Sequence, residues 1–401
     1  MGREGEVVQE LIRSFEADNP GIRVEVQQIP WSAAHEKLLT AHVGRSTPDI
    51  AQLGNTWIAE FVALRALEPL DSLIGRSERM DPASYFSGVW STNVIDDRLY
   101  GVPWYVDTRL LFYRKDILEE AGYAEMPRDW STWRTAMDAI QERAGPESFA
   151  VFLPANEPTQ AVILGLQSGS KLLDENATRG AFSEPPFRRG FDFYLDLFRS
   201  GLAPPVGNTE IANLYQEFER GYFAMYITGP WNLGEFRRRV SLPPGKGWGT
   251  APLPGPSGGE DGVSLAGGAS LVLFRDSKRK EAAWRLVEYL SRPEVQREFY
   301  RLSGDLPSRL DAWEDELLIG DPLARAFFDQ LQRVVPTPKI PEWEQILSRI
   351  TVYAEAAIRG ALSPEEALQA LDRDVDEILE KRRWLLERRA EGEPGNGGGE
   401  R

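Results

Sequence analysis

The sequence predicts an α/β protein of two domains with mainly parallel sheets, and three observations support this class. At 401 residues, the chain is longer than a single hydrophobic core usually serves. Its composition, 42% hydrophobic and 27% charged, is that of an ordinary globular protein. Segments with strand periodicity alternate along the chain with segments of helical periodicity, which indicates α/β layers. Ligands of such folds gather at the carboxyl ends of strands, so a site is expected in the loops after strands.

The first elements show both periodicities. Apolar residues within 7–15 fall on one face of a helix, and residues 22–26 alternate apolar and polar side chains as a half-buried strand does. Ser32 is the predicted N-cap of a second helix that ends near Gly44. A short buried strand is expected at 48–53, directly before a polar and aromatic loop.

The alternation continues to the end of the chain. Strands are predicted at 110–113, 149–153, 223–227 and 264–274, and helices at 130–143, 185–199, 215–220 and 278–290. A final helix begins at Ser363, which is followed by Pro364 and by a capping-box glutamate, Glu366. Irregular connections are expected at 252–262 and 304–309, and a disordered tail at 392–401.

Charge and residue usage exclude several classes of function. The formal net charge of −16 would repel nucleic acid, and no apolar run approaches the length of a membrane span. The chain has no cysteine, and its two histidines, His35 and His42, stand seven apart, too far to grip one zinc ion as an i, i+4 pair could. Motifs for phosphate binding or for a nucleophilic serine are absent. We therefore expect no metal, no cofactor and no nucleic-acid partner.

Aromatic residues stand beside polar residues in three loops that follow predicted strands. Trp57 comes after Asn55 and Thr56, Trp231 follows Gly229-Pro230, and the segment 104–109 contains Tyr105, Asp107 and Arg109. A neutral sugar presents an apolar face and a rim of hydroxyls, so its site needs flat aromatic rings and fixed polar partners. The alternative for each ring is burial in a core.

Two further features of these loops have alternative explanations. Asp107 either accepts a hydrogen bond from a ligand hydroxyl or pairs with Arg109. Gly229, Gly267 and Gly268 permit either close approach of the backbone to a ligand or a sharp turn. Four other tryptophans lie inside amphipathic helices and are expected to pack in a core: Trp130, Trp133, Trp284 and Trp384.

Five segments, in this order, resemble the maltose-binding-protein-like family of extracellular solute-binding proteins. They are Phe15 to Val24, Thr47 to Ile50, Tyr100 to Asp116, Thr228 to Trp231, and Gly267 to Ser270 before Ala282-Ala283-Trp284. The resemblance covers about residues 5 to 390. It implies a two-lobed periplasmic-binding-protein-like fold of type II, in which three chain crossings form a hinge and a sugar lies in the cleft between the lobes.

The resemblance also implies domain bounds and a ligand site. One lobe would comprise residues 1–106 and 255–305, and the other residues 107–254 and 306–391. Trp231 would be a stacking platform in the second lobe, facing Asn55, Thr56 and Trp57 of the first. The remaining expected contacts are Tyr105, Asp107, Arg109, Gly267, Gly268 and Trp343, which stands in the segment 338–343.

By the same resemblance, the chain is a receptor and not an enzyme. It would bind a mono- or oligosaccharide by closing its hinge, and deliver it to the permease subunits of an ABC importer. The alternatives are a receptor of this fold for a non-sugar solute and a carbohydrate-active enzyme. We expect a monomer at the periplasmic or extracellular face of a bacterial membrane, touching that membrane only through the permease or a lipid anchor. The family's export signal and first strand are expected to be missing before Glu6.

Overall fold

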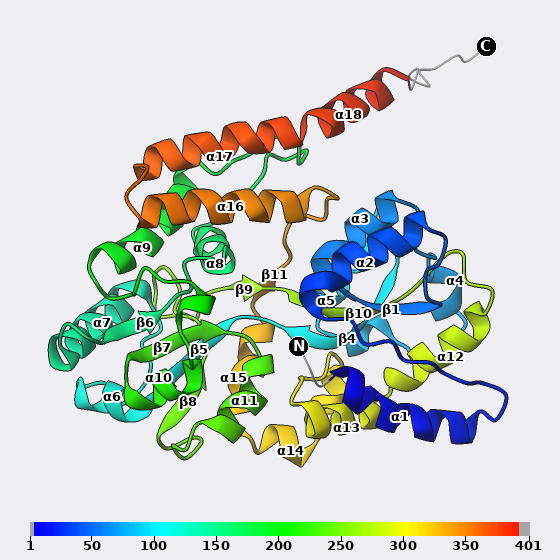
Figure 1. Ribbon diagram of the computed structural model, residues 1–401, viewed down its shortest axis with the longest axis horizontal. Coiled ribbons are helices and arrows are strands. Elements are labelled where there is room, and N and C mark those ends of the chain that lie inside the picture. The colour runs from blue at the N-terminus through cyan, green and yellow to red at the C-terminus, as the bar shows by residue number, and fades with distance from the viewer. Residues whose placement is uncertain (1–3, 393–401) are drawn as a thin grey trace, which may run out of the picture.

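The structure of the protein is a computed structural model that describes residues 4–392, and it has two lobes joined by several connections (Figure 1). The first lobe surrounds a three-stranded sheet of order β1-β10-β4, and the second surrounds a four-stranded sheet of order β6-β7-β5-β8. The α/β class and the two-lobed architecture agree with the sequence-based prediction. The expected tail at 392–401 lies outside the described residues, apart from Gly392.

The elements around the first sheet come from two parts of the chain. They are α1 (Glu4–Asp18), α2 (Trp31–Val43), β1 (Ile50–Gly54), the 3-10 turn η1 (Asn55–Trp57), α3 (Ile58–Ala63), α4 (Asp71–Ile74), η2 (Pro82–Ser84), α5 (Ser87–Ser91), β2 (Val94–Ile95), β3 (Arg98–Leu99), β4 (Gly101–Asp107), β10 (Gly267–Leu273), α12 (Lys280–Leu290) and α13 (Pro293–Ser303). The buried side chains of α1 are the five apolar residues whose spacing predicted its inner face.

The elements around the second sheet follow β4. They are β5 (Leu110–Arg114), α6 (Lys115–Glu120), α7 (Trp130–Ala144), β6 (Phe149–Phe152), α8 (Thr159–Gln167), α9 (Pro185–Arg199), η3 (Asn208–Glu210), α10 (Leu214–Arg220), β7 (Phe223–Thr228), α11 (Trp231–Arg239), β8 (Trp248–Ala251), η4 (Leu310–Glu314), α14 (Glu316–Ile319), α15 (Pro322–Leu331), α16 (Trp343–Ile358), α17 (Pro364–Ile378) and α18 (Glu380–Gly392). A short parallel pair, β9 (Ser264–Leu265) and β11 (Val334–Val335), lies between the two sheets in Figure 1.

The prediction of mainly parallel sheets was wrong. Strand β10 runs antiparallel to both of its neighbours, and in the second sheet only β6 and β7 are parallel. The reason for the first sheet is the path of the chain. Strand β4 carries the chain out of the first lobe and β10 carries it back, so the two strands lie side by side in opposite directions.

Two local predictions also differ from the structure. Residues 22–26 form no strand because no neighbouring backbone pairs with them, although Ile22, Val24 and Val26 still pack on the first-lobe core. Helix α2 begins at Trp31, with Pro30 at the N-cap in place of Ser32, because the backbone leaves the extended conformation directly after Pro30, whose ψ is 136°.

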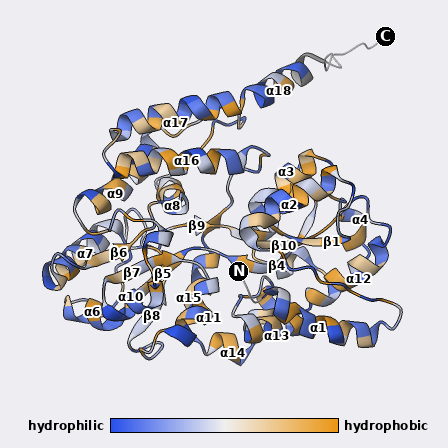
Figure 2. Cartoon of the chain, viewed as in Figure 1, coloured by the Kyte–Doolittle hydropathy of each residue, from blue (hydrophilic) through white to orange (hydrophobic). Residues whose placement is uncertain are grey.

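The outermost helices, α17 and α18, show where the spacing of apolar residues predicts burial correctly and where it does not. Helix α17 alternates hydrophilic and hydrophobic residues along its ribbon (Figure 2), and Ser363 caps it with the predicted capping box. Helix α18 continues beyond the body of the second lobe in Figure 1. Trp384 on this helix is therefore 50% exposed, contrary to the prediction, whereas Trp130, Trp133 and Trp284 are buried as predicted.

Candidate functional site

The turn between β4 and β5 places two charged side chains where the chain passes from one lobe to the other. Asp107 is the last residue of β4 and pairs with Gly267 of β10, while Leu110 begins β5 in the second sheet. Arg109 lies between these strands, and its backbone N–H donates to the hydroxyl of Ser264 at 3.2 Å. The strand ends thus fix both charges beside the interlobe connection.

The guanidinium of Arg109 joins this turn to a second loop. Its Nη1 donates to Asp107 Oδ1 at 2.5 Å, and its Nη2 donates to Glu157 Oε1 at 3.2 Å. Burial by itself would lower the pKa of Arg109, but the two carboxylates outweigh that effect and the pKa is raised. Arg109 therefore carries a full charge in a largely buried position, where its side chain is 15% exposed.

Trp231 lies directly against this cation. The Cζ atom of Arg109 is 4.3 Å from the centroid of the Trp231 ring, within the range of a cation–π interaction. The ring also packs against the backbone of Gly229, where a Cβ atom would come within 1.9 Å of it. Trp231 is nevertheless 39% exposed, so part of this large aromatic ring faces solvent.

A buried polar network supports the turn that precedes Trp231. The Asn232 amide donates to the Thr228 hydroxyl at 2.7 Å, and the Tyr215 hydroxyl donates to Asn232 Oδ1 at 2.8 Å. Thr228 and Asn232 are both buried, so these bonds satisfy groups that water cannot reach. The end of β7 and the start of α11 are thereby held in one arrangement.

Glu157 also belongs to this site, although no sequence pattern predicted it. It stands in the loop between β6 and α8, so it follows a strand like the other members of the site. Its side chain is 22% exposed and contacts Arg109 across 48 positions of sequence. The rule that points to the ends of strands could have found it, but no aromatic neighbour marked this loop.

The 3-10 turn η1 of the first lobe lines a pocket that also contains residues of the second lobe. Asn55 is buried, donates to the Thr92 hydroxyl at 2.6 Å and accepts from the Ser270 hydroxyl at 3.1 Å. Together with Thr56, it lines a pocket whose other wall comes from the segment between β11 and α16. The lining residues are Asn55, Thr56, Ala59, Thr92, Ile95, Ala266, Thr337, Pro338 and Lys339.

Two predicted aromatic contacts are packed inside the protein in this conformation. Trp57 is 6% exposed and stacks on Trp31 with ring centroids 4.3 Å apart. Trp343 is fully buried in the second-lobe core, although its Nε1 has no hydrogen-bond partner. Neither ring offers a free face to a ligand here, so Trp231 is the exposed ring among the three predicted tryptophans.

Tyr105 and the glycine pair lie on the facing strands β4 and β10. The Tyr105 hydroxyl accepts a hydrogen bond from the Gln52 amide at 2.6 Å. Burial raises its pKa well above the usual value, with a further contribution from the carboxylate of Asp305. Gly268 has φ of +143°, and a Cβ atom there would come within 2.4 Å of the Tyr105 carbonyl oxygen. Gly268 thus permits close strand pairing beneath the site.

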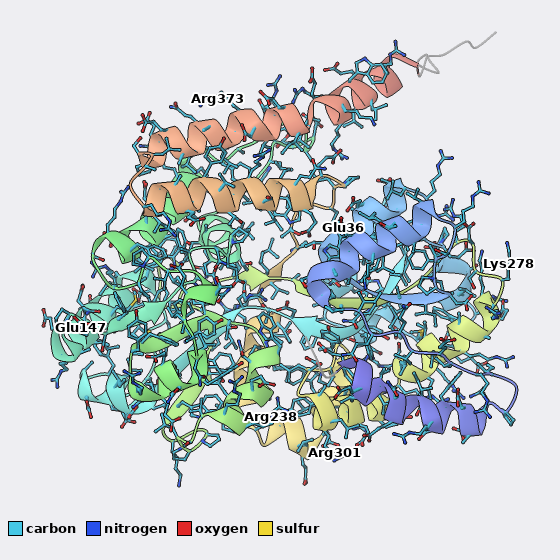
Figure 3. All side chains as sticks on the ribbon, viewed as in Figure 1. Glu36, Glu147, Arg238, Lys278, Arg301 and Arg373 are labelled. Atoms are coloured by element: carbon cyan, nitrogen blue, oxygen red, sulfur yellow. The ribbon has the colours of Figure 1, made fainter. Side chains whose placement is uncertain are left out.

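Two polar atoms of this turn are buried without a hydrogen-bond partner, the Nε of Arg109 and the hydroxyl oxygen of Thr108. Among residues 4–392, no group of three or more histidine or acidic side chains is arranged to hold a metal ion. No helix in this part of the chain is long and apolar enough to cross a membrane. In Figure 3 the labelled charged side chains Glu147 and Lys278 lie at the outer ends of the two lobes.

Two lobes with a hinge turn, an exposed tryptophan and fixed polar partners define the class of two-lobed solute-binding proteins. Residues 2–297 match the family model described as bacterial extracellular solute-binding protein, and the chain belongs to this family. Membership confirms the predicted fold and the prediction that the protein binds a solute and does not convert it.

Individual relatives extend over almost the whole chain. A putative binding protein of Brucella abortus is 26% identical, with 94% of this chain and 91% of the relative covered. The diacetylchitobiose binding protein DasA of Streptomyces coelicolor is 23% identical, with 92% and 86% covered. Among solved structures, the sugar-binding protein MalE of Xanthomonas citri is 50% identical, with 96% and 98% covered and a TM-score of 0.91.

Proposed function

We propose that this chain is the carbohydrate receptor of an ABC-type importer. The observation that carries this proposal is Trp231, an exposed ring held by Arg109 beside the carboxylates of Asp107 and Glu157. A partly open aromatic ring surrounded by fixed hydrogen-bonding groups suits the apolar face and hydroxyl rim of a sugar. The name of the Xanthomonas citri relative, a sugar-binding protein of 50% identity, supports the same class of ligand.

The charge of the site favours a neutral ligand. Arg109 is already paired with two carboxylates, so the trio carries a formal charge of −1 and the cation that contacts Trp231 is not free to attract an anion. A polyamine receptor would need several unpaired carboxylates around its aromatic rings, whereas these carboxylates share one guanidinium. The residues around Trp231 therefore favour a sugar over the alternative of an ionic solute.

Each predicted contact has a proposed role. Trp231 stacks on the sugar, while Asp107 and Arg109 offer hydrogen bonds to its hydroxyls. Asn55 and Thr56 face it from the first lobe. Trp57, Tyr105, Gly267, Gly268 and Trp343 shape the walls from positions that are buried or part of a strand pair.

Binding would act through the relative position of the lobes. A sugar that touches both lobes only in a closed form binds that form more tightly, and so shifts the population toward it. The permease subunits of the importer would then recognise the closed receptor. We propose a monomer that works outside the cytoplasmic membrane, as the family description supports, with one lobe comprising residues 1–106 and 255–305 and the other residues 107–254 and 306–391.

The experiment is a calorimetric titration of the protein with neutral mono- and oligosaccharides. The Trp231→Ala variant tests the platform, and Trp384→Ala is its matched control, since it removes an exposed tryptophan from α18 instead. We expect at least one sugar to bind saturably, with affinity reduced by about tenfold or more in Trp231→Ala and unchanged in Trp384→Ala. Equal affinities for wild type and Trp231→Ala, or no binding of any sugar, would refute the proposal.

A further inference from the structure

A lysine of the second lobe bonds directly to the backbone of the first. Lys339 stands in the segment 336–342, which connects β11 to α16. Its Nζ donates to the carbonyl oxygens of Val94 at 2.9 Å and Ser91 at 3.2 Å, more than 240 positions earlier in the sequence. One ammonium group therefore bridges two parts of the chain that belong to different lobes.

Both ends of this bridge are anchored in their own lobes. Next to Lys339, Ile340 is 3% exposed and packs in the second-lobe core, as does Trp343 three positions later. On the other side, Ser91 is the last residue of α5, and Val94 pairs with Leu99 in the hairpin of β2 and β3. A change in the spacing of the lobes at this point must stretch or break the bridge.

The bridge lies at the pocket between the lobes. Lys339 lines the same pocket as Thr92 and Ile95, and its two acceptors, Ser91 and Val94, directly precede those residues in the chain. No carboxylate within the described chain forms an ion pair with Lys339 at 4.0 Å or less. Its charge instead meets two carbonyl oxygens, and such charge-assisted bonds are stronger than neutral ones.

The neighbouring contact between α5 and β11 is also close. A Cβ atom on Gly88 would come within 2.8 Å of Val334 Cγ2 and 3.3 Å of the Val334 carbonyl oxygen. The absence of a side chain on Gly88 therefore lets Val334 of β11 pack closely against helix α5. The two hydrogen bonds of Lys339 thus add directional interactions to an interface that van der Waals packing forms nearby.

We infer that Lys339 is a positioning residue of the receptor, which fixes the spacing between the two walls of this pocket before a ligand arrives. A wall that is already in place loses less conformational freedom on binding, so the bridge raises affinity without touching the ligand. The effect on affinity rests on the proposed sugar-binding function, whereas the effect on the ligand-free protein does not.

Three variants test the bridge. Lys339→Met keeps an unbranched side chain of similar length and removes its donors, and Lys339→Arg keeps a positive charge and several N–H donors at this position. Lys115→Met is the matched control, because Lys115 Nζ donates to the Gly245 carbonyl at 3.1 Å within the second lobe. It removes the same kind of bond without affecting the contact between the lobes.

Hydrogen–deuterium exchange without sugar is the first readout. In Lys339→Met, peptides spanning residues 87–95 and 334–342 should exchange about three- to tenfold faster, because the local opening that exposes their amides becomes easier. Lys115→Met should leave these peptides unchanged, and Lys339→Arg should restore most of their protection. Wild-type exchange rates in Lys339→Met would overturn the inference.

Calorimetry with the best sugar is the second readout. The dissociation constant should rise about three- to tenfold in Lys339→Met and stay close to wild type in Lys115→Met. If no sugar binds even the wild-type protein, the proposed function fails while the exchange result still decides the bridge. If exchange changes and affinity does not, the bridge exists but does not position the site, which also overturns the inference.

Discussion

The guanidinium carbon of Arg109 lies 4.3 Å from the centroid of the Trp231 ring, while its nitrogens bind Asp107 and Glu157. One buried cation thus orients an aromatic ring and two carboxylates from three different loops. In a ligand-binding site, such a group acts on affinity even where it makes no contact with the ligand, because it fixes the groups that do. Arg109 is in this sense the centre of the site.

Replacing Arg109 tests this arrangement. In Arg109→Met the two carboxylates lose their shared cation, and Trp231 loses its partner, so sugar affinity should fall by about tenfold or more. Titration calorimetry measures the loss. Arg388→Met is a suitable control, because Arg388 lies 4.5 Å from the Trp384 ring on α18. Retention of wild-type affinity in Arg109→Met would show that the guanidinium does not organise the site.

The two tryptophans Trp231 and Trp343 should differ in what their loss affects. Trp343 is fully buried, so Trp343→Ala should lower the free energy of unfolding by about 3–5 kcal/mol through the cavity it leaves. Trp231 is partly exposed, and Trp231→Ala should cost about 1 kcal/mol or less while affinity falls. Urea unfolding of both variants distinguishes the roles. A small loss of stability in Trp343→Ala would contradict its place in the core.

Gly268 should tolerate no side chain. Its φ of +143° is rare for other residues, and the Cβ of an alanine would come within 2.4 Å of the Tyr105 carbonyl oxygen. We expect Gly268→Ala to reduce the free energy of unfolding by about 2 kcal/mol or more. Gly21→Ala is the control, since nothing lies within 4 Å of the position its Cβ would take. Equal unfolding midpoints for the two variants would count against the strained pairing of β4 and β10.

Asp305 should make stability depend on pH. Burial, assisted by the charge of Glu4, raises its pKa to about 7 from an ordinary value of 3.8. An acid whose pKa is raised in the folded state binds more protons there than in the unfolded chain. Its contribution therefore favours folding at low pH and is lost as pH rises from about 4 to about 7.

The Asp305→Asn variant measures this contribution. The free energy of unfolding of this variant minus that of wild type should be roughly 1–4 kcal/mol larger at pH 8 than at pH 4. The reason is that wild type must bury the charge of Asp305 at the higher pH, whereas the amide stays neutral. Urea unfolding at several pH values gives the difference, and Asp276→Asn at an exposed turn provides the baseline. A difference that stays constant with pH would mean that Asp305 is not protonated in the folded protein near neutrality.

Local patterns predicted those features that depend on neighbours in sequence. The spacing of apolar residues was sufficient for the inner face of α1, and the order Ser363-Pro364 with Glu366 was sufficient for the start of α17. The pairing of Asp107 with Arg109, two positions apart, was also among the predicted alternatives.

Features that depend on distant neighbours were not predictable in this way. Trp57 and Trp231 stand in similar loops. Trp57 is buried beneath Trp31 of α2, whereas Trp231 remains 39% exposed. Residues 22–26 have the alternation of a strand and lack a partner to pair with. Glu157 joins the site only through Arg109, 48 positions away, and Lys339 reaches the first lobe from the far end of the chain.

A crystal structure of the protein with its tightest-binding sugar tests the central claim most directly. The sugar should lie between the lobes, intact, with one ring against Trp231 and its hydroxyls within hydrogen-bonding distance of the groups around Arg109 and of Asn55 or Thr56. A sugar bound elsewhere, or a cleft that contains a cleaved product in place of the added sugar, would contradict it.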